Sequence, residues 1–212
     1  MYLARTPVLL TPLYRGRVWS IPTKEKVLYL TFDDGPIPGV TPWVLDTLRE
    51  HGAHATFFVV GNNAAKHPDL LERIREEGHA VGNHTWDHVK GWRTRRFAFL
   101  RNVLRAQTIT GTSLFRPPYG RITRAQSRAL RRRFDVVMWD VLAADFDTRV
   151  SEARCLRNVI THARAGSIIV FHDSLKAEPR LRFALPRALE HLAGEGYAFE
   201  ALPMDGIKER RK

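Results

Sequence analysis

The stretch Val27–Pro36, which reads VLYLTFDDGP, decides the fold. Its first six residues are an uncharged run of apolar and β-forming residues, typical of a strand buried on both faces. Two adjacent carboxylates, Asp33 and Asp34, follow the run at once, before a Gly-Pro pair that favours a turn. A simple turn would explain the two acids, but charges directly after a buried strand also indicate a strand end where polar residues gather.

Outward from this strand, strand-like and helix-like segments alternate along almost the whole chain. Further strands are predicted at 55–60, 79–82, 113–115, 134–139, 167–171 and 197–201. Helices are predicted at 41–51, 68–77, 94–110, 123–132, 151–164 and 180–192. Apolar strands alternating with helices predict a parallel sheet covered on both faces. Because a full eightfold barrel takes about 250 residues, 212 residues predict an α/β fold with a distorted (β/α)7 barrel in a single domain.

Composition divides the chain into three predicted parts: an N-terminal extension at 1–26 that packs on or trails from the barrel, the barrel domain at 27–203, and a basic C-terminal tail at 204–212. The apolar stretch at 7–14 is short and interrupted by Pro12, so neither a signal peptide nor a transmembrane segment is predicted. The expected location is the cytoplasm. Cys155 is the only cysteine, which excludes an intrachain disulfide and favours a buried apolar role in a helix.

The net charge of +12 favours anionic partners. Basic clusters occur at 93–96, 131–133 and 208–212. They come with no recognition helix, RNA-binding motif or zinc-finger spacing, so no specific nucleic acid is predicted as a partner. Peripheral association with an anionic membrane surface is a further prediction, set against the simpler interpretation of solvated helix faces. The oligomeric state stays open.

Polar residues follow five of the predicted strands: Asp33 and Asp34; His84 and His88; Arg116; Asp140 and Asp145; His172 and Asp173. In a parallel α/β barrel these strand ends open on one face, where active sites are built. The sequence therefore predicts one functional site at that face.

A metal site is the first component expected there. His84 and His88 are four residues apart, so one helical turn would place both imidazoles on the same side. With Asp34 they make a three-ligand set that leaves positions open for water and substrate, as in catalytic zinc sites. The alternative is an exposed turn with two incidental histidines.

Three further residues have a functional and a structural interpretation. Arg116 is either a surface arginine at a strand end or a fixed cation beside a carboxylate, held by a proline-stiffened loop. His172 and Asp145 are either a satisfied histidine and a loop cap, or an oriented acid–imidazole pair.

Three motifs, TFDDGP at 31–36, HTWDH at 84–88 and RPPYG at 116–120, occur in this order and resemble the polysaccharide deacetylase family. This is carbohydrate esterase family 4, which shares the NodB homology domain. The resemblance covers 27–201. It implies a distorted barrel of about seven strands and a metal-dependent hydrolase that removes N-acetyl groups from an N-acetylated amino sugar or polysaccharide.

The resemblance also implies residue roles. Asp34, His84 and His88 resemble the metal ligands, with zinc expected and cobalt, nickel or manganese as alternatives. Asp33 resembles the catalytic base that takes a proton from a metal-activated water, and Arg116 the arginine that pairs with it. His172 resembles the catalytic acid and Asp145 the carboxylate that orients it.

Four more positions are implied to touch the substrate. Tyr119, with Pro118 before it, lies where a backbone N–H helps to bind the oxyanion. Phe146 and Val170 help to wall the acetyl pocket, and they stand where the family often has tryptophan and leucine.

Rival interpretations stay open at this point. The same scaffold can act on another acyl group, as a deformylase, an O-acetyl esterase or a cyclic amidase. A non-catalytic basic protein that binds glycan or nucleic acid is the other alternative. The loops that choose between polymeric, oligomeric and lipid-linked substrates carry no readable code.

Overall fold

The computed structural model describes residues 3–7, 14, 16–204 and 207. In these residues the strands form one sheet in the order β1-β6-β5-β4-β3-β2-β8-β7, with β9 beside β2, and all its strand pairs are parallel. The strands are β1 Arg17–Val18, β2 Val27–Asp33, β3 Ala55–Val59, β4 Ala80–Asn83, β5 Leu114–Phe115, β6 Asp135–Val137, β7 Val141–Leu142, β8 Ile168–His172 and β9 Ala198–Phe199. The helices are α1 Val40–Glu50, α2 Gly61–Lys66, α3 Pro68–Glu76, α4 Arg96–Thr110, α5 Arg124–Leu130, α6 Glu152–Ile160 and α7 Glu178–Gly194, with short 3-10 turns at Gly91–Arg93 and Pro118–Gly120.

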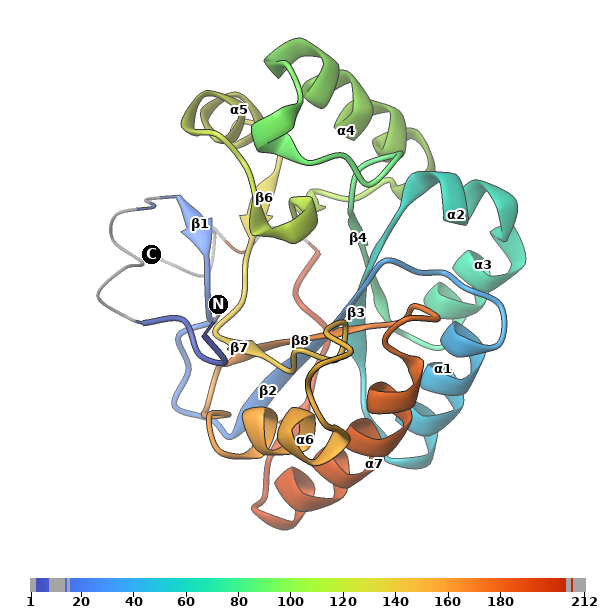
Figure 1. Cartoon of the computed structure of the whole chain (residues 1–212), viewed down its shortest axis with the longest axis vertical. Coiled ribbons are helices and arrows are strands. Elements are labelled where there is room, and N and C mark those ends of the chain that lie inside the picture. Colours follow the sequence, from blue (N-terminus) through green and yellow to red (C-terminus); the bar gives the residue numbers. More distant parts are fainter. Residues whose placement is uncertain (1–2, 8–13, 15, 205–206, 208–212) are drawn as a thin grey trace.

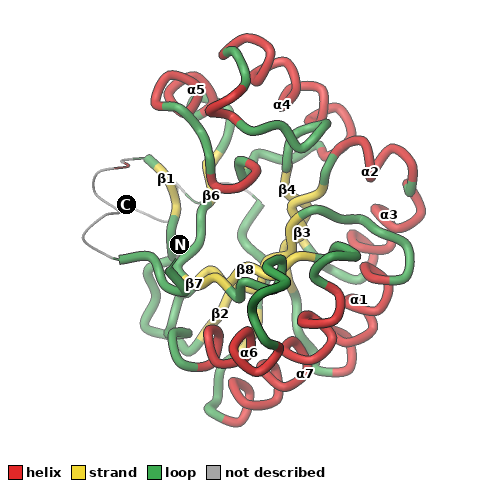
Figure 2. Tube along the Cα trace, viewed as in Figure 1, coloured by secondary structure: helices red, strands yellow, loops and turns green. Residues whose placement is uncertain are grey.

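The helices lie outside the curved sheet, with α4 and α5 on one side and α6 and α7 on the opposite side (Figures 1 and 2). The predicted α/β distorted barrel is thereby confirmed. No pairing between β1 and β7 closes the sheet in the part of the chain that is described. Instead, Arg5 makes an antiparallel bridge with Val141, and the Leu142 N–H donates to the Ala4 carbonyl at 2.8 Å. Ala4 and Arg5 therefore lie along β7.

Alternation along β2 determines which side chains enter the barrel. Leu28, Leu30 and Phe32 belong to the core between the sheet and the outer helices. Tyr29 belongs to a second core inside the barrel, together with Ile168 of β8. Because side chains alternate across a strand, Thr31 and Asp33 share the inner side with Tyr29. The last inward position of this buried strand is therefore a carboxylate.

Several local predictions were incomplete. The two-residue strands β1 and β7 and the helix α2 were not predicted, since none of them carries a readable periodic pattern. The predicted strand 134–139 is shorter in the structure, ending at Val137. The prediction that Asp140 lies with the other strand-end acids is wrong. Asp140 accepts a hydrogen bond from Ser167, which precedes β8, so it lies at the opposite end of that strand from His172.

The predicted part boundaries stay predictions, although both flanking parts contribute to the sheet region. β1 comes from the predicted extension, and Ile207 of the predicted tail is buried, with its N–H donating to Asp135 at 2.8 Å. The basic cluster at 208–212 and residues 8–13 of the apolar stretch lie outside the described residues. Cys155 is buried in α6, as predicted. Among the described helices, none is both long and apolar enough to span a bilayer.

Candidate active site

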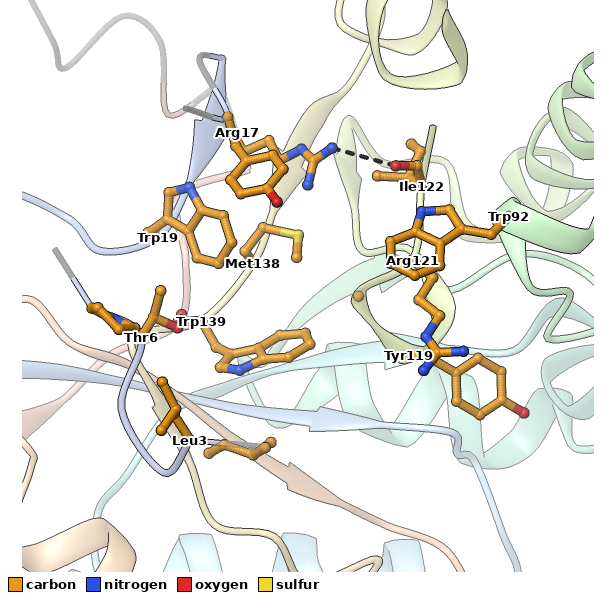
Figure 3. Close-up of a pocket in the computed structure, with 14 residues that line it drawn as sticks. Leu3, Thr6, Arg17, Trp19, Trp92, Tyr119, Arg121, Ile122, Met138 and Trp139 are labelled. Atoms are coloured by element: carbon orange, nitrogen blue, oxygen red, sulfur yellow. Dashed lines mark hydrogen bonds between the residues drawn. The ribbon is translucent and has the colours of Figure 1, made fainter. Parts of the chain in front are cut away.

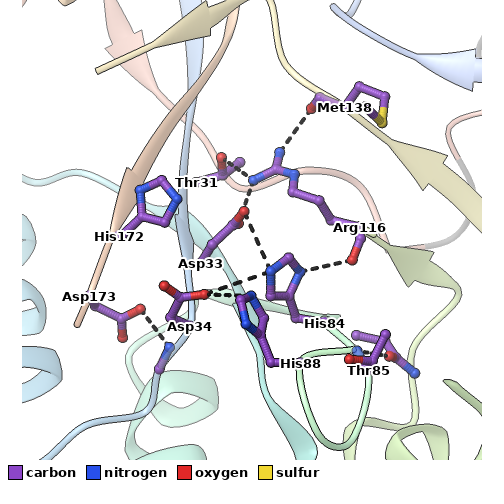
Figure 4. Close-up of polar contacts among 12 residues, drawn as sticks. Thr31, Asp33, Asp34, His84, Thr85, His88, Arg116, Met138, His172 and Asp173 are labelled. Atoms are coloured by element: carbon purple, nitrogen blue, oxygen red, sulfur yellow. Dashed lines mark hydrogen bonds and ion pairs between the residues drawn. The ribbon is translucent and has the colours of Figure 1, made fainter. Parts of the chain in front are cut away.

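The sheet register brings the strand-end residues together. Asp33, the last residue of β2, is the direct parallel partner of His172, the last residue of β8. His84 follows β4 directly, and Arg116 follows β5. Figure 4 shows the side chains of Asp33, His84 and Arg116 meeting, with the ring of His172 beside them.

The three predicted metal ligands converge. One ligand atom each from Asp34, His84 and His88 lies within 4.8 Å of the others. The Asp34 Oδ1 atom is 3.1 Å from His88 Nε2 and 3.8 Å from His84 Nε2. Burial opposes the charge on Asp34, but the hydrogen bond from His88 and the neighbouring imidazoles hold the pKa of Asp34 well below its usual value. The cluster therefore includes an ionised carboxylate.

The donor chemistry of this cluster fits a divalent cation. The Nδ1 atom of His84 lies 2.8 Å from the Arg116 carbonyl, which can only accept, so Nδ1 carries the hydrogen and Nε2 is free to act as a ligand. Burial lowers the pKa of His84 to about 4, against the attraction of Asp33, so the ring is neutral at physiological pH. A neutral imidazole and a carboxylate are ligands that zinc and similar ions take in catalytic sites.

The backbone route to this cluster differs from the prediction. His84 and His88 do not lie on a helical turn, since the chain from 84 to 90 is irregular. Thr85 and His88 both have positive φ angles, of 67° and 53°. Asn102 of α4 accepts hydrogen bonds from the Trp86 and Asp87 N–H groups at 2.8 and 3.1 Å, which fixes this loop. The imidazoles thus meet through a tight loop, and the helical explanation of their spacing is wrong.

Arg116 lies buried behind Asp33. Its Nη1 donates to Asp33 Oδ1 and to Thr31 Oγ1, each at 2.7 Å, and its Nη2 donates to the Met138 carbonyl at 2.9 Å. The guanidinium also lies 4.0 Å from the centre of the Phe58 ring. The surface interpretation of Arg116 is therefore excluded, and the fixed cation beside a carboxylate is what the structure contains.

His172 and Asp145 form the predicted pair. Both carboxylate oxygens of Asp145 bind His172, one accepting from the backbone N–H at 2.7 Å and the other lying 2.8 Å from Nδ1. Burial by itself lowers the pKa of His172, but the charge and hydrogen bond of Asp145 raise it to about 9. Arg180 of α7 holds Asp145 in turn by donating to its carbonyl. The imidazole is therefore cationic at neutral pH, with Nε2 unused by Asp145.

A cavity of about 650 Å³ unites these groups. Asp33, the three candidate ligands and His172 line it, as do the predicted contact residues Tyr119, Phe146 and Val170. Arg116, Asp145 and Pro118 do not line it. Lys90, Ser174 and Lys176 line it without having been predicted, because nothing in their sequence context marks them.

Asp173, a strand-end carboxylate to which the sequence assigns no role, supports the acidic loop from a buried position. Asp173 accepts hydrogen bonds from the Gly35 N–H at 3.0 Å and from Thr41 Oγ1 at 2.6 Å. Burial raises the pKa of Asp173 to about 8, against those two hydrogen bonds. A Cβ atom at Gly35 would lie 1.9 Å from an Asp173 carboxylate oxygen, so any other residue here would force that hydrogen-bonded carboxylate to move. In the sequence, the position of Asp173 directly after His172, at the end of an apolar strand, is the feature that marks it.

An aromatic groove of about 350 Å³ continues from the cavity (Figure 3). Tyr119, Arg121, Trp139 and Leu142 line both spaces. The far wall of the groove comes from the N-terminal segment and the 3-10 turn after β4, and it includes the rings of Tyr14, Trp19 and Trp92. Thr6 helps to hold the described N-terminal residues there, since its N–H donates to the Asp140 carbonyl and its Oγ1 donates to the Trp139 carbonyl.

Comparison with known proteins decides the family. A family model described as polysaccharide deacetylase matches residues 20–136, more than half of the chain. The chain belongs to the polysaccharide deacetylase family. Deacetylases of this family are metal-dependent, in agreement with the ligand cluster formed by Asp34, His84 and His88.

Two relatives in the family match over most of their length. The peptidoglycan-N-acetylglucosamine deacetylase of Bacillus cereus is 32% identical, over 85% of this chain and 88% of that protein. The chitooligosaccharide deacetylase of Azorhizobium caulinodans is 31% identical, over 89% of this chain and 98% of that protein. A crystal structure of the Bc1960 peptidoglycan N-acetylglucosamine deacetylase, bound to an N-oxidanyl-benzamide, has a TM-score of 0.86 at 30% identity, covering 93% of this chain and 95% of that one.

Proposed function

We propose that this chain is a metal-dependent hydrolase that removes the N-acetyl group from an amino sugar within a glycan. One observation carries the proposal: a ligand cluster, an arginine-held carboxylate and a carboxylate-held imidazole face a single cavity of about 650 Å³. The names of the relatives support this reaction, and offer no support for a deformylase, an O-acetyl esterase or a cyclic amidase.

Asp34, His84 and His88 would hold the ion, and zinc is the ion that we propose. When bound, such an ion polarises the acetyl carbonyl and makes a water molecule more acidic. What the chain itself supplies is a neutral imidazole at His84 and an ionised carboxylate at Asp34, both ready to ligate without first losing a proton.

Asp33 is the proposed base. Arg116 holds its Oδ1 atom at 2.7 Å, while its Oδ2 atom lies 3.9 Å from His84 Nε2, on the side of the ligand cluster. That second oxygen is positioned to take the proton of the attacking water. Positioned proton transfer of this kind contributes about 10² to 10⁴ in rate.

His172 is the proposed acid. Since Asp145 binds Nδ1, the proton that reaches the departing amine comes from Nε2. The raised pKa of about 9 keeps the imidazole protonated through the neutral range, so the acid is in its donating form when the amide breaks. The Phe146 ring packs edge-on to the His172 ring, with 5.0 Å between the ring centres. Together with Val170, Phe146 supplies the apolar wall proposed for the acetyl methyl group.

We propose a glycan of several sugar units as the substrate, in the class of peptidoglycan or chitin oligomers. The aromatic groove supports this, because it continues from the cavity and offers ring faces to which sugar C–H groups bind well. The Tyr119 N–H, on the turn that begins at Pro118, is proposed to help bind the oxyanion. Such a donor is commonly worth about 3 kcal/mol.

The test is acetate release from a panel of N-acetylated sugars, with and without chelator and restored metal, combined with metal analysis of two variants. Asp33→Asn should keep the metal and lose about 10² to 10⁴ in kcat. His84→Ala should lose metal and activity together. Wild-type turnover by Asp33→Asn would remove the base assignment, and full metal occupancy in His84→Ala would remove the ligand assignment.

A further inference from the structure

One segment accounts for the entire net charge of the chain. Residues 88–134 contain thirteen of the 34 basic residues and none of the 22 acidic ones. The rest of the chain is left with 21 basic and 22 acidic residues, which nearly cancel. The charge of +12 is therefore a property of one region, formed by α4, α5 and the loops that join them to the sheet. Figure 1 shows α4 and α5 side by side.

Most of these cations have no acidic partner. Ten arginines of the segment are exposed, and none of the ten forms an ion pair with a carboxylate of the described residues: Arg93, Arg95, Arg96, Arg101, Arg105, Arg121, Arg124, Arg128, Arg132 and Arg133. Several arginines on other helices are paired, as in Arg73 with Glu77 and Arg182 with Glu178. Unpaired positive charge is thus most concentrated on this face, where no acidic residue lies in the segment to offset it.

Large apolar side chains stand among these arginines. On α4 the buried residues Phe99, Val103 and Ala106 face the barrel. The opposite stripe carries Phe97 and Leu104, which are 74% and 41% exposed and lie seven residues apart, with arginines at 101 and 105 between and beside them. Trp92, in the turn before α4, is 64% exposed. Exposing these apolar side chains to water is unfavourable. Their grouping on the outward side of α4 therefore indicates a partner that can bury them.

We propose that this face, which we call the α4–α5 face, docks on the surface of an anionic lipid bilayer. Arginine binds lipid phosphate groups with two parallel hydrogen bonds, and each basic residue near an anionic surface strengthens binding about fivefold. Exposed tryptophan and phenylalanine enter the interface between headgroups and acyl chains. A soluble polyanion would pair with the arginines but would leave the side chains of Phe97 and Leu104 in water, which is why the bilayer is favoured.

Docking has a consequence for the catalytic cavity. Lys90 and Arg121, both from the basic segment, line the cavity, and Trp92 lines the aromatic groove. The cavity therefore opens beside the α4–α5 face, and a docked molecule would act on glycan held close to the lipid surface. The docking itself does not depend on the proposed deacetylase activity.

The experiment is sedimentation with vesicles of phosphatidylcholine alone or with 30% phosphatidylglycerol, at 50 and 500 mM NaCl. Binding is expected only to the anionic vesicles, and at least tenfold weaker at high salt. The triple variant Arg96→Glu, Arg101→Glu, Arg128→Glu should bind at least tenfold more weakly. The two changes on α4 lie early in the helix, where negative charge suits the helix dipole or is neutral, so folding should be kept.

The matched control is the triple variant Arg154→Glu, Arg157→Glu, Arg187→Glu, which changes three exposed arginines of α6 and α7 on the opposite side of the barrel. It has the same net charge as the first triple variant and should bind within twofold of the wild type. Equal loss in the two triple variants, or no binding to anionic vesicles at low salt, would overturn the proposal. Acetate release from a short soluble substrate should be unchanged in both, which separates lost docking from lost activity.

A last variant separates a bilayer from a soluble polyanion. Phe97→Ser removes an exposed ring and no charge, so it should weaken vesicle binding several-fold and leave the salt-sensitive binding of duplex DNA unchanged. If Phe97→Ser binds vesicles as well as the wild type does, the α4–α5 face recognises charge alone and the bilayer assignment is wrong.

Discussion

Replacing Asp145 with asparagine keeps the shape of the carboxylate and removes its charge. In the wild type, both oxygens of Asp145 accept from His172, and the pair raises the pKa of the imidazole to about 9, from an ordinary value of 6.5. That difference corresponds to about 3 kcal/mol of preference for the protonated ring. An amide offers one acceptor instead of two and no charge, while the burial that opposes protonation stays. Only the weaker attraction of Asp33 and Asp34 then acts against burial, so the pKa of His172 in Asp145→Asn should fall toward 6.5.

The effect on the reaction follows from the protonated fraction of His172. At pH 8 a pKa of about 9 leaves about nine-tenths of the wild-type rings protonated, whereas a pKa of 6.5 leaves about 3%. The wild type should therefore exceed Asp145→Asn by about thirtyfold in kcat at pH 8 and by less than about twofold at pH 6. The free energy of unfolding should depend on pH in the same direction. Because the pKa of His172 is raised in the folded state, its pairing with Asp145 stabilises the fold fully below pH 6.5, and this contribution is lost as the pH rises through 9.

The assay is acetate release between pH 5.5 and 9.5 by the wild type, Asp145→Asn and His172→Asn. NMR titration of the metal-free proteins reports the His172 pKa directly. His172→Asn, which has no proton to give, should be impaired to the same degree across the range. A ratio of wild type to Asp145→Asn that stays constant with pH would show that Asp145 acts only by holding the ring, and the reasoning from its charge would be refuted.

Three further outcomes are expected. Burial lowers the pKa of His79 to about 4, with repulsion from His54 adding to it, so the stability that depends on a neutral ring is present above pH 6.5 and lost as the pH falls toward 4. When the pH is lowered from 7 to 4.5, the free energy of unfolding should fall by about 2–3 kcal/mol less in His79→Gln than in the wild type, as measured by denaturant titration. Equal falls in the two proteins would contradict this. Gly35→Ala should destabilise the fold by about 1–3 kcal/mol, because its Cβ would collide with Asp173, and Gly35→Ala with Asp173→Ser should recover part of that loss in the same titration. Trp19→Ala should lower kcat/KM about tenfold on an N-acetylated tetrasaccharide and leave the disaccharide unaffected; an equal fall on both would show that the groove does not bind additional sugar units.

The long strands could be predicted because each one carries its own signal. β2, β3 and β8 are five to seven residues long and almost wholly buried, so they read as apolar runs without any knowledge of their neighbours. β1 and β7 have two residues each. Such short strands form because a neighbouring strand offers hydrogen-bond partners. The residues of the short strands themselves do not reveal which strand that is. Asp140 was misplaced for the same reason, since the boundary between β6 and β7 depends on those partners.

In the candidate site, too, some features could be predicted from the sequence and others could not. Asp33, Asp34 and His172 could be located because they end apolar strands. The contacts that hold them could not be predicted, because they join residues far apart in the chain: Thr31 with Arg116 across 85 positions, and Gly35 with Asp173 across 138. A threonine inside an apolar strand reads as a β-former, and no spacing rule relates it to a distant arginine. His84 and His88 were found by their spacing, yet a loop brings them together.

The proposed base and acid are linked through the register of the sheet. Asp33 on β2 and His172 on β8 are direct partners, and each is the last inward residue of its strand. A slip of one residue in β2 would turn Asp33 toward the helices and carry Leu28, Leu30 and Phe32 into the barrel. The apolar packing of those three side chains against the outer helices opposes that slip. The core between sheet and helices therefore fixes the distance between base and acid, even though none of its residues enters the cavity.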